Sequence, residues 1–407
     1  MPKFGPHPEL RRMNAWDSLS GTARVAVIGA GTMGTGIAQV AAEAGHDVVV
    51  VDASEAALER AKSALAKALE GLVARGKRTP EVAEQSLVRC TWSTQLDAVK
   101  GAVLVIEAIV ERADAKASLF QALETLLPPD AVLATNTSSL SVTAVAGSCA
   151  HPERVVGLHF FNPAPVMALV EVIPALQTDP ALVHACTALM QRWGKEPALA
   201  RDTPGFIVNR VARPFYGEAL RCVEEGLASA AEVDAAMRHI GFRMGPFELM
   251  DLIGNDVNFA VTGSVYQATF YDPRYRPSSI QERLVQAGWF GRKSGRGHYD
   301  YAGGAGAPTG TAEQPEVSDR ILAMLINEAA EAVFWGIASA EDVDRAMVRG
   351  VNYPKGLCTW SDALGAAWTV DRLDALQARY GEDRYRCSPL LRDYALQGRG
   401  FFSDVRN

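Results

Sequence analysis

Short apolar runs alternate with longer amphipathic stretches through the first half of the chain. Two of the amphipathic stretches predict helices at about 33–44 and at 55 to about 75. Runs rich in β-branched residues predict strands at 25–28, 48–51, 103–106, 132–135, 155–159 and 169–173. Strands that alternate with helices in this way are typical of a doubly wound α/β sheet.

The second half of the chain is mostly helical in pattern from Thr203 onward. The only further strand pattern is at 298–301. The stretch after it is rich in Gly, Ala and Pro, which predicts a flexible linker. We therefore expect a loose tail, a sheet domain, two all-α modules and a linker between the modules. The expected bounds are 1–21 for the tail, 22–202 for the sheet domain, 203–301 and 316–407 for the modules, and 302–315 for the linker.

The two helical modules are copies of one pattern. Residues 218–237 match residues 328–347 at a constant offset of 110. Each copy carries an aspartate, Asp234 or Asp344, which a helix-surface or capping position explains without any further function. Two such modules can bury a shared apolar face, which a single module would cover with a second chain. A homodimer and a monomer containing an internal pseudo-dimer both agree with this pattern.

Composition and charge exclude several classes of protein. With 407 residues, 48% of them hydrophobic, the chain has the composition of an ordinary globular protein. A net charge of −7 gives no general attraction to nucleic acid or to an anionic membrane. Neither a membrane span nor a secretory signal is evident, so we expect a cytoplasmic protein. Six scattered cysteines without metal-ligand spacing predict free thiols and no metal site.

Three closely spaced glycines, Gly29, Gly31 and Gly34, follow the first predicted strand. Glycines at this place let backbone N–H groups approach a pyrophosphate, and the next helix points its positive end at that charge. Asp52 ends the second strand, where its carboxylate can accept a hydrogen bond from a ribose 2′-hydroxyl and would repel a 2′-phosphate. A glycine turn alone is not specific, but in this context it predicts an NAD site.

A histidine and a glutamate stand in two predicted strands that otherwise look buried. His159 ends a strand, and the carboxyl ends of strands border the active crevice of open α/β sheets. Glu171 interrupts an apolar run, and burying an isolated carboxylate is costly. If the two residues pair, the carboxylate orients the imidazole, and the other ring nitrogen can take a hydroxyl proton. A structural ion pair between Glu171 and an arginine explains the glutamate equally well.

Ser138 and Asn209 are two further polar candidates. Ser138 follows the fourth predicted strand, where a local turn or a helix cap also explains it. Asn209 is a short polar group in an apolar helix, which a packed amide explains as well. Arg75, Lys77 and Arg78 form a basic helix end that suits either a bound phosphate or solvent.

Six motifs, in their order and spacing, resemble those of the L-3-hydroxyacyl-CoA dehydrogenase family. They are the glycine turn 29–34 and the segments 105–111, 136–140, 159–163, 169–172 and 203–210. The resemblance implies a Rossmann-like domain that uses NAD to oxidise (S)-3-hydroxyacyl-CoA to 3-oxoacyl-CoA. It also implies that His159 is the general base, that Glu171 orients it, and that Ser138 and Asn209 donate hydrogen bonds to the substrate's C3 oxygen.

The resemblance further implies a set of binding residues. Those for the acyl-CoA are Ser138, Asn209 and, at the long helix, Arg75. Those for NAD are Gly29, Gly31, Thr32, Met33, Gly34, Asp52, Glu111, Lys116, Asn162 and Lys293. The chain departs from the family on the long helix: relatives can carry a serine and a lysine where Ala68 and Arg75 stand here.

The sequence leaves the substrate open. Relatives with duplicated modules serve fatty-acid β-oxidation or phenylacetate breakdown, with 3-hydroxybutyryl-CoA or 3-hydroxyadipyl-CoA as substrate. Arg213 or Arg243 could meet a distal carboxylate, although a surface position explains either residue. A related dehydrogenase of a hydroxy acid such as gulonate and a non-catalytic, crystallin-like NAD-binding protein are the alternatives.

Overall fold

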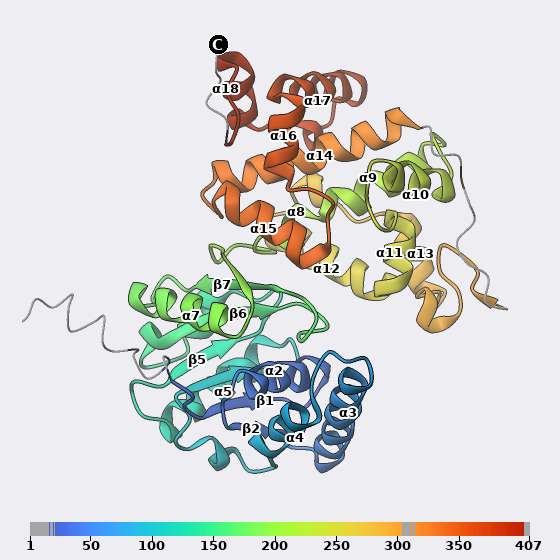
Figure 1. The fold of residues 1–407 in the computed structure, drawn as a ribbon. Coiled ribbons are helices and arrows are strands. Elements are labelled where there is room, and N and C mark those ends of the chain that lie inside the picture. The colour runs from blue at the N-terminus through green and yellow to red at the C-terminus, as the bar shows by residue number, and fades with distance from the viewer. Residues whose placement is uncertain (1–15, 17–18, 20, 303–309, 311–313, 403–407) are drawn as a thin grey trace, which may run out of the picture. The chain divides into compact units, whose positions relative to one another are not determined.

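The computed structural model describes residues 16, 19, 21–302, 310 and 314–402. The chain divides into two compact units, residues 1–203 and 204–407, which are described separately (Figure 1). The expected linker and most of the expected tail lie outside the described residues. Trp16 and Leu19 of that tail are described, and both are buried in the core of the first unit. The expectation of a loose tail is therefore wrong for these two residues, because their apolar side chains pack against the sheet domain.

Eight strands form one sheet in the first unit. They are β1 (Val25–Ile28), β2 (Val48–Val51), β3 (Cys90–Ser93), β4 (Leu104–Glu107), β5 (Val132–Thr135), β6 (Val155–Phe160), β7 (Leu169–Pro174) and β8 (Glu196–Leu199). Their order is β3-β2-β1-β4-β5-β6-β7-β8, and all neighbours are parallel except β6 and β7. Strands covered on both faces need continuous apolar runs, and β1, β2 and β5 are buried throughout. The predicted doubly wound α/β fold is confirmed.

The hydrophobic pattern predicted the six inner strands to within one residue but missed both edge strands. In β3 only the first residue, Cys90, is buried, and β8 contains Pro197. An edge strand is paired on one side only, so it needs neither a continuous apolar run nor an N–H group at every position.

Helices connect the strands of the first unit. They are α2 (Thr32–Glu43), α3 (Glu55–Ala74), α4 (Pro80–Arg89), α5 (Ala113–Leu126), α6 (Val142–Ala146) and α7 (Pro180–Arg192), with short 3₁₀ turns at η2 (Leu96–Val99) and η3 (Pro152–Arg154). The two helices predicted from the sequence, α2 and α3, have the expected bounds to within one residue. Ser54 begins α3 because its hydroxyl accepts a hydrogen bond from the N–H of Ala57.

The second unit is helical. Its first copy of the repeat comprises the short α8 (Val208–Val211), α9 (Arg213–Glu224), α10 (Ala230–His239), α11 (Pro246–Ile253), α12 (Asn255–Ala268) and α13 (Ser279–Gln286). The second copy comprises α14 (Pro315–Phe334), α15 (Ala340–Val351), α16 (Leu357–Leu364), α17 (Ala366–Tyr380) and α18 (Pro389–Gln397). The expected tandem all-α modules are confirmed. The strand signal at 298–301 corresponds only to an isolated bridge between Arg296 and Asp300.

The two equivalent aspartates of the repeat cap helices. Asp234 of α10 is fully buried and accepts hydrogen bonds of 2.8 and 3.0 Å from the first-turn N–H groups of α11. Asp344 of α15 does the same for α16, at 2.7 and 2.9 Å. The capping interpretation is therefore correct and the helix-surface alternative is wrong. Each aspartate caps the following helix, which fixes the turn between the two helices.

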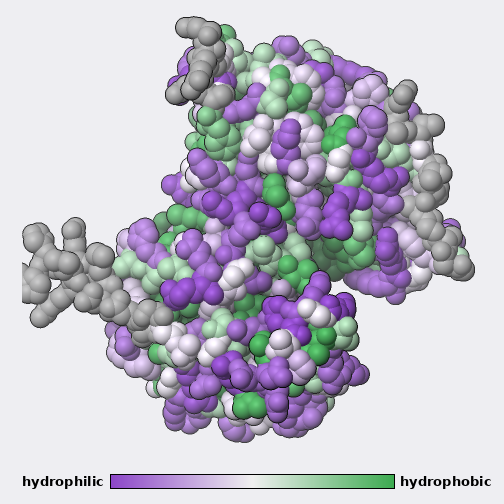
Figure 2. All heavy atoms as spheres, viewed as in Figure 1, coloured by the Kyte–Doolittle hydropathy of each residue, from purple (hydrophilic) through white to green (hydrophobic). Residues whose placement is uncertain are grey.

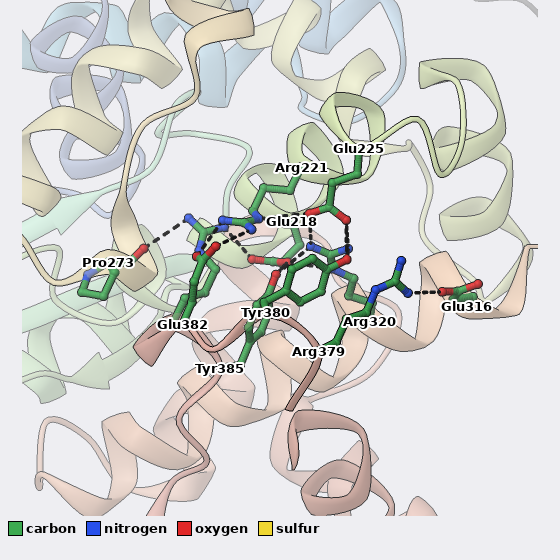
Figure 3. A network of polar contacts seen from close by, with 11 residues as sticks. Glu218, Arg221, Glu225, Pro273, Glu316, Arg320, Arg379, Tyr380, Glu382 and Tyr385 are labelled. Atoms are coloured by element: carbon green, nitrogen blue, oxygen red, sulfur yellow. Dashed lines mark hydrogen bonds and ion pairs between the residues drawn. The ribbon is translucent and has the colours of Figure 1, made fainter. Parts of the chain in front are cut away.

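The two copies of the repeat bind each other through reciprocal ion pairs. Each copy contributes one buried glutamate that binds two arginines of the other copy. The pairs are Glu218–Arg320 (3.0 Å), Glu218–Arg384 (2.7 Å), Glu328–Arg210 (2.8 Å) and Glu328–Arg274 (3.5 Å). Figure 3 shows the half of this arrangement around Glu218. Such an exchange of equivalent contacts is typical of a two-fold symmetric dimer, and here both halves belong to one chain.

The visible surface is mixed in polarity. On the face in Figure 2, hydrophilic side chains predominate and hydrophobic ones are scattered between them. Within the described part of the chain, no helix combines the length and the apolar character that a membrane span requires.

Candidate active site

The glycine turn lies at the switch point of the sheet, where β1 has β2 on one side and β4 on the other. Gly29 has a φ of 106°, and a Cβ there would lie 2.5 Å from the carbonyl oxygen of Ala108. A Cβ at Gly34 would lie 1.8 Å from the carbonyl oxygen of Gly29. Both positions therefore require glycine. A Cβ at Gly31 would meet nothing within 4 Å, which leaves the backbone open to a ligand.

The start of α2 fits an anion. Its N-cap is Gly31, so no side chain caps the N–H groups of the first turn, which contains Thr32 and Met33. These N–H groups and the positive end of the helix dipole suit the pyrophosphate of a dinucleotide.

Asp52 lies directly after β2 and is half-buried. Its Oδ2 accepts a hydrogen bond of 2.8 Å from the N–H of Ala30, and its Oδ1 accepts one of 2.9 Å from the N–H of Ser54. A carboxylate oxygen can accept two hydrogen bonds, so Asp52 can still receive a ribose hydroxyl. The residues of this site thus fit NAD.

His159 and Glu171 lie opposite each other in the antiparallel pair of β6 and β7. The imidazole Nδ1 lies 2.7 Å from Oε2 of Glu171. The glutamate is fully buried, and the histidine is 6% exposed. A carboxylate only accepts hydrogen bonds, so Nδ1 carries the proton and Nε2 is left as the basic nitrogen.

Asn136 connects the histidine strand to the turn that follows β5. Its Oδ1 accepts a hydrogen bond of 2.8 Å from the N–H of Phe160, the residue after His159. Since β5 and β6 are parallel neighbours, this turn and His159 lie at the same carboxyl edge of the sheet. Asn136 was not among the predicted site residues, although it begins the 136–140 motif and directly follows a predicted strand.

Glu111 organises the turn that carries Ser138. Its Oε1 accepts hydrogen bonds from the Thr137 hydroxyl (2.6 Å), the Ser138 N–H (2.9 Å) and the Ser139 N–H (3.1 Å). Burial raises the pKa of Glu111, but the charge of Lys116 and these hydrogen bonds outweigh burial, so the pKa is lowered. Glu111 is therefore ionised at neutral pH and holds the turn together.

Lys116 is a buried cation between two carboxylates. Its ammonium nitrogen lies 2.6 Å from Oε1 of Glu107 and 3.1 Å from Oε2 of Glu111. Glu107 is fully buried and also accepts hydrogen bonds from the Ile109 N–H and the Thr135 hydroxyl, each of 2.7 Å. Glu107 was not among the predicted site residues, because only the fold reveals that the charge at this strand end meets a buried lysine.

The remaining candidates are placed as follows. Asn162 is exposed just after β6, and Arg75 is exposed at the C-cap of α3. Asn209 lies in α8, within the second unit. Lys293 is also in the second unit, in the 3₁₀ turn η5 (Arg292–Ser294), and its ammonium pairs with Asp256 at 2.7 Å. The first unit thus brings together the glycine turn, the His–Glu pair and the Ser138 turn at one edge of its sheet.

Both units of the chain match a known enzyme family. Residues 24–203 match the NAD binding domain of 3-hydroxyacyl-CoA dehydrogenase, so the chain is an NAD-dependent oxidoreductase. Residues 205–301 and 317–400 match the C-terminal domain of the same enzyme. The chain belongs to the 3-hydroxyacyl-CoA dehydrogenase family.

Relatives in this family differ in how much of the chain they cover. A 3-hydroxyadipyl-CoA dehydrogenase from Escherichia coli K12 is 41% identical, and the match covers 93% of this chain and 98% of the relative. A probable 3-hydroxybutyryl-CoA dehydrogenase from Deinococcus radiodurans is 42% identical over 68% of this chain and 99% of its own. A crystal structure of 3-hydroxybutyryl-CoA dehydrogenase from Escherichia coli K12 has a TM-score of 0.88 and 40% identity, covering 92% of this chain and 98% of its own.

Proposed function

We propose that this chain reversibly oxidises an (S)-3-hydroxyacyl-CoA to the 3-oxoacyl-CoA. The observation that carries the proposal is the His159–Glu171 pair, with Nδ1 and Oε2 2.7 Å apart at the edge of an NAD-binding sheet. NAD, when bound, accepts the hydride from C3 of the substrate. Nε2 of His159 takes the proton of the C3 hydroxyl, and the Glu171 carboxylate stabilises the imidazolium that forms.

Ser138 and Asn209 donate hydrogen bonds to the C3 oxygen in this proposal. Negative charge grows on that oxygen as its proton leaves, so fixed donors stabilise the transition state more than the ground state. The Ser138 turn suits this task because Glu111 fixes its backbone through two N–H groups. The exposed guanidinium of Arg75 is suited to a phosphate of the CoA moiety.

The proposed substrate is a dicarboxylic 3-hydroxyacyl-CoA of aromatic, phenylacetate-type catabolism. The 3-hydroxyadipyl-CoA dehydrogenase relative matches 93% of the chain, whereas the 3-hydroxybutyryl-CoA dehydrogenase of D. radiodurans matches 68%. A solved 3-hydroxybutyryl-CoA dehydrogenase also covers 92% of the chain, so coverage agrees with both esters, and the support for the dicarboxylic substrate is the name of the relative that matches 93%.

Substitution of the proposed base tests the reaction. His159→Gln removes the basic nitrogen and should lower kcat by about 100-fold or more, the range typical of general-base catalysis. The assay is NADH oxidation with acetoacetyl-CoA as substrate. His184→Gln is the matched control, because His184 is exposed on α7. Turnover by His159→Gln close to that of the unchanged protein would refute the assignment.

We also propose that the chain is a monomer in solution. A single module would have to cover its apolar face with a second chain, whereas the second copy here makes reciprocal ion pairs with the first within one chain. Light scattering should then give the chain mass of 43.6 kDa. A mass twice as large would contradict this proposal.

A further inference from the structure

Arg213, the first residue of α9, is a buried cation with no carboxylate partner among the residues that the structure describes. Six arginines are buried in the described part of the chain, and five of them have a carboxylate oxygen within 3.5 Å. Those five are Arg154, Arg210, Arg274, Arg320 and Arg384. Arg213 is 7% exposed, and among the described residues its only hydrogen bond runs from Nη1 to the Thr262 hydroxyl, at 3.0 Å. Within the described segments, its Nε has no hydrogen-bond acceptor.

The surroundings of Arg213 are aromatic. Its guanidinium carbon lies 5.0 Å from the centre of the Tyr216 ring. Phe215, the residue before Tyr216, packs against both Phe242 and Tyr353, at ring-centre distances of 4.9 and 5.8 Å. A guanidinium stays charged even when buried, and its charge without a counterion opposes folding. An anionic ligand would supply the missing counterion.

Arg213 lies one helical turn after Asn209. The residue that joins α8 to α9, Ala212, has right-handed helical angles (φ −79°, ψ −9°), so the backbone stays helical between the two positions. Residues four apart on a helix share a face and are separated by about 6 Å along the axis. At the equivalent positions, 110 residues on, the second copy has Asp319 and Ala323. Packing of the module therefore does not require an arginine at this place.

We infer that Arg213 binds the distal carboxylate of a dicarboxylic 3-hydroxyacyl-CoA whose C3 oxygen is bound by Asn209. This inference rests on the proposed function and names the residue that selects the substrate. In a six-carbon acyl chain, three C–C bonds separate C3 from the terminal carboxyl carbon, a span of about 4 Å. One helical turn between the amide and the guanidinium matches that span. The planar guanidinium can hold a carboxylate through two parallel hydrogen bonds.

Two substrates that differ only at the distal end test the inference. Reduction of 3-oxoadipyl-CoA and of acetoacetyl-CoA by NADH is compared for the unchanged protein and for Arg213→Met. Methionine keeps an unbranched side chain but removes the positive charge. The ratio of kcat/KM for the adipyl ester to that for the acetoacetyl ester should fall by about 100-fold, mostly through KM. Arg283→Gln, at an exposed arginine of α13, should leave the ratio unchanged.

Two other roles of Arg213 predict a different result: it could bind a phosphate of CoA, or it could serve only the fold. Both esters carry the same CoA, so either case would lower both activities in parallel and overturn the inference. Thermal unfolding adds a second measurement: loss of an unpaired buried charge should not lower Tm, whereas loss of a structural cation should. A lower Tm of Arg213→Met together with an unchanged ratio would also overturn it.

Binding without turnover separates this inference from the proposed reaction. Adipyl-CoA and butyryl-CoA have no hydroxyl to oxidise, and calorimetric titration measures their affinity directly. Arg213→Met should weaken adipyl-CoA binding about 100-fold more than butyryl-CoA binding. If the unchanged protein reduces neither oxoacyl ester, the proposed function fails. If both ligands lose affinity equally in Arg213→Met, the carboxylate assignment fails.

Discussion

Glu171 lies directly opposite His159 in the antiparallel pair of β6 and β7, with Oε2 2.7 Å from Nδ1. Two adjacent strands thus set the geometry of the pair. Adjacent strands of a sheet are held by their backbone hydrogen bonds, so neither residue depends on a mobile loop for its position.

Glu171→Gln tests how much the carboxylate contributes. The amide keeps the size of the side chain but cannot stabilise an imidazolium, and it can present an N–H group that selects the wrong tautomer. We expect kcat to fall by about 100-fold or more, with a smaller change in KM. Steady-state kinetics with NADH and acetoacetyl-CoA measures this, with Glu153→Gln at an exposed glutamate as the control. A loss confined to KM would show that Glu171 serves substrate binding instead.

Lys116→Met tests the ion pairs that hold the Ser138 turn. Methionine leaves the carboxylates of Glu107 and Glu111 close together without their shared cation. Breaking a buried pair from one side destabilises a protein by about 3–5 kcal/mol, so Tm should fall clearly. Activity at a temperature where the variant is still folded should fall by about tenfold or more, because Glu111 no longer fixes the donor turn.

The matched control for this variant is Lys62→Met, since Lys62 pairs with Glu59 on the surface of α3. Surface pairs contribute about 1 kcal/mol or less. If Lys116→Met lost stability but kept full kcat in the folded state, its ion pairs would serve the fold alone.

The strand and helix pattern could be predicted because it is local. Apolar runs marked the six inner strands, and the glycine turn with Asp52 marked the NAD site. The ion pair of Glu107 and Lys116 could not be predicted. Glu107 ends a strand and Lys116 lies in a helix, and the two side chains meet only once α5 packs on the sheet. Arg213 was expected at the surface because buried arginines are rare, and only the fold shows its burial.

The stability of the second unit should depend on pH through Glu225. Its carboxylate accepts hydrogen bonds from both terminal nitrogens of Arg320, at 2.8 and 3.1 Å, and from the Tyr380 hydroxyl (Figure 3). Burial raises the pKa of Glu225, but these contacts outweigh burial and lower the pKa to about 2. Since the folded pKa lies below the ordinary value of 4.5, the stabilisation is complete above that value and is lost as the pH falls toward 2.

Glu225→Gln should therefore cost about 1–3 kcal/mol of unfolding free energy at pH 7, and the difference from the unchanged protein should shrink below about pH 4.5. Urea unfolding at several pH values measures this. Glu316→Gln is the control. Glu316 is exposed, and its ion pair with Arg379 is long, at 3.5 Å, and lies in solvent. A cost for Glu225→Gln that stays constant down to pH 3 would contradict the assigned ion pairs.

The reciprocal glutamates should couple the two copies of the repeat into one folding unit. Glu218→Gln removes the buried carboxylate that Arg320 and Arg384 share, and Glu328→Gln removes the one that Arg210 and Arg274 share. Arg320 keeps its pair with Glu225, and Arg274 keeps its pair with Asp272. Each substitution should cost about 3–5 kcal/mol, because the arginines that remain are buried. Glu341→Gln, at an exposed position on α15, should cost little.

The decisive observation is which copy responds. Glu218 belongs to the first copy and its arginines to the second, so Glu218→Gln should lower the protection of backbone amides from hydrogen exchange in both α9 and α14. Glu328→Gln should give the same pattern, because Glu328 belongs to the second copy and its partners, Arg210 and Arg274, belong to the first. If each substitution loosened only the copy that carries it, the two modules would fold independently, and the contacts between them would not form a pseudo-dimer interface.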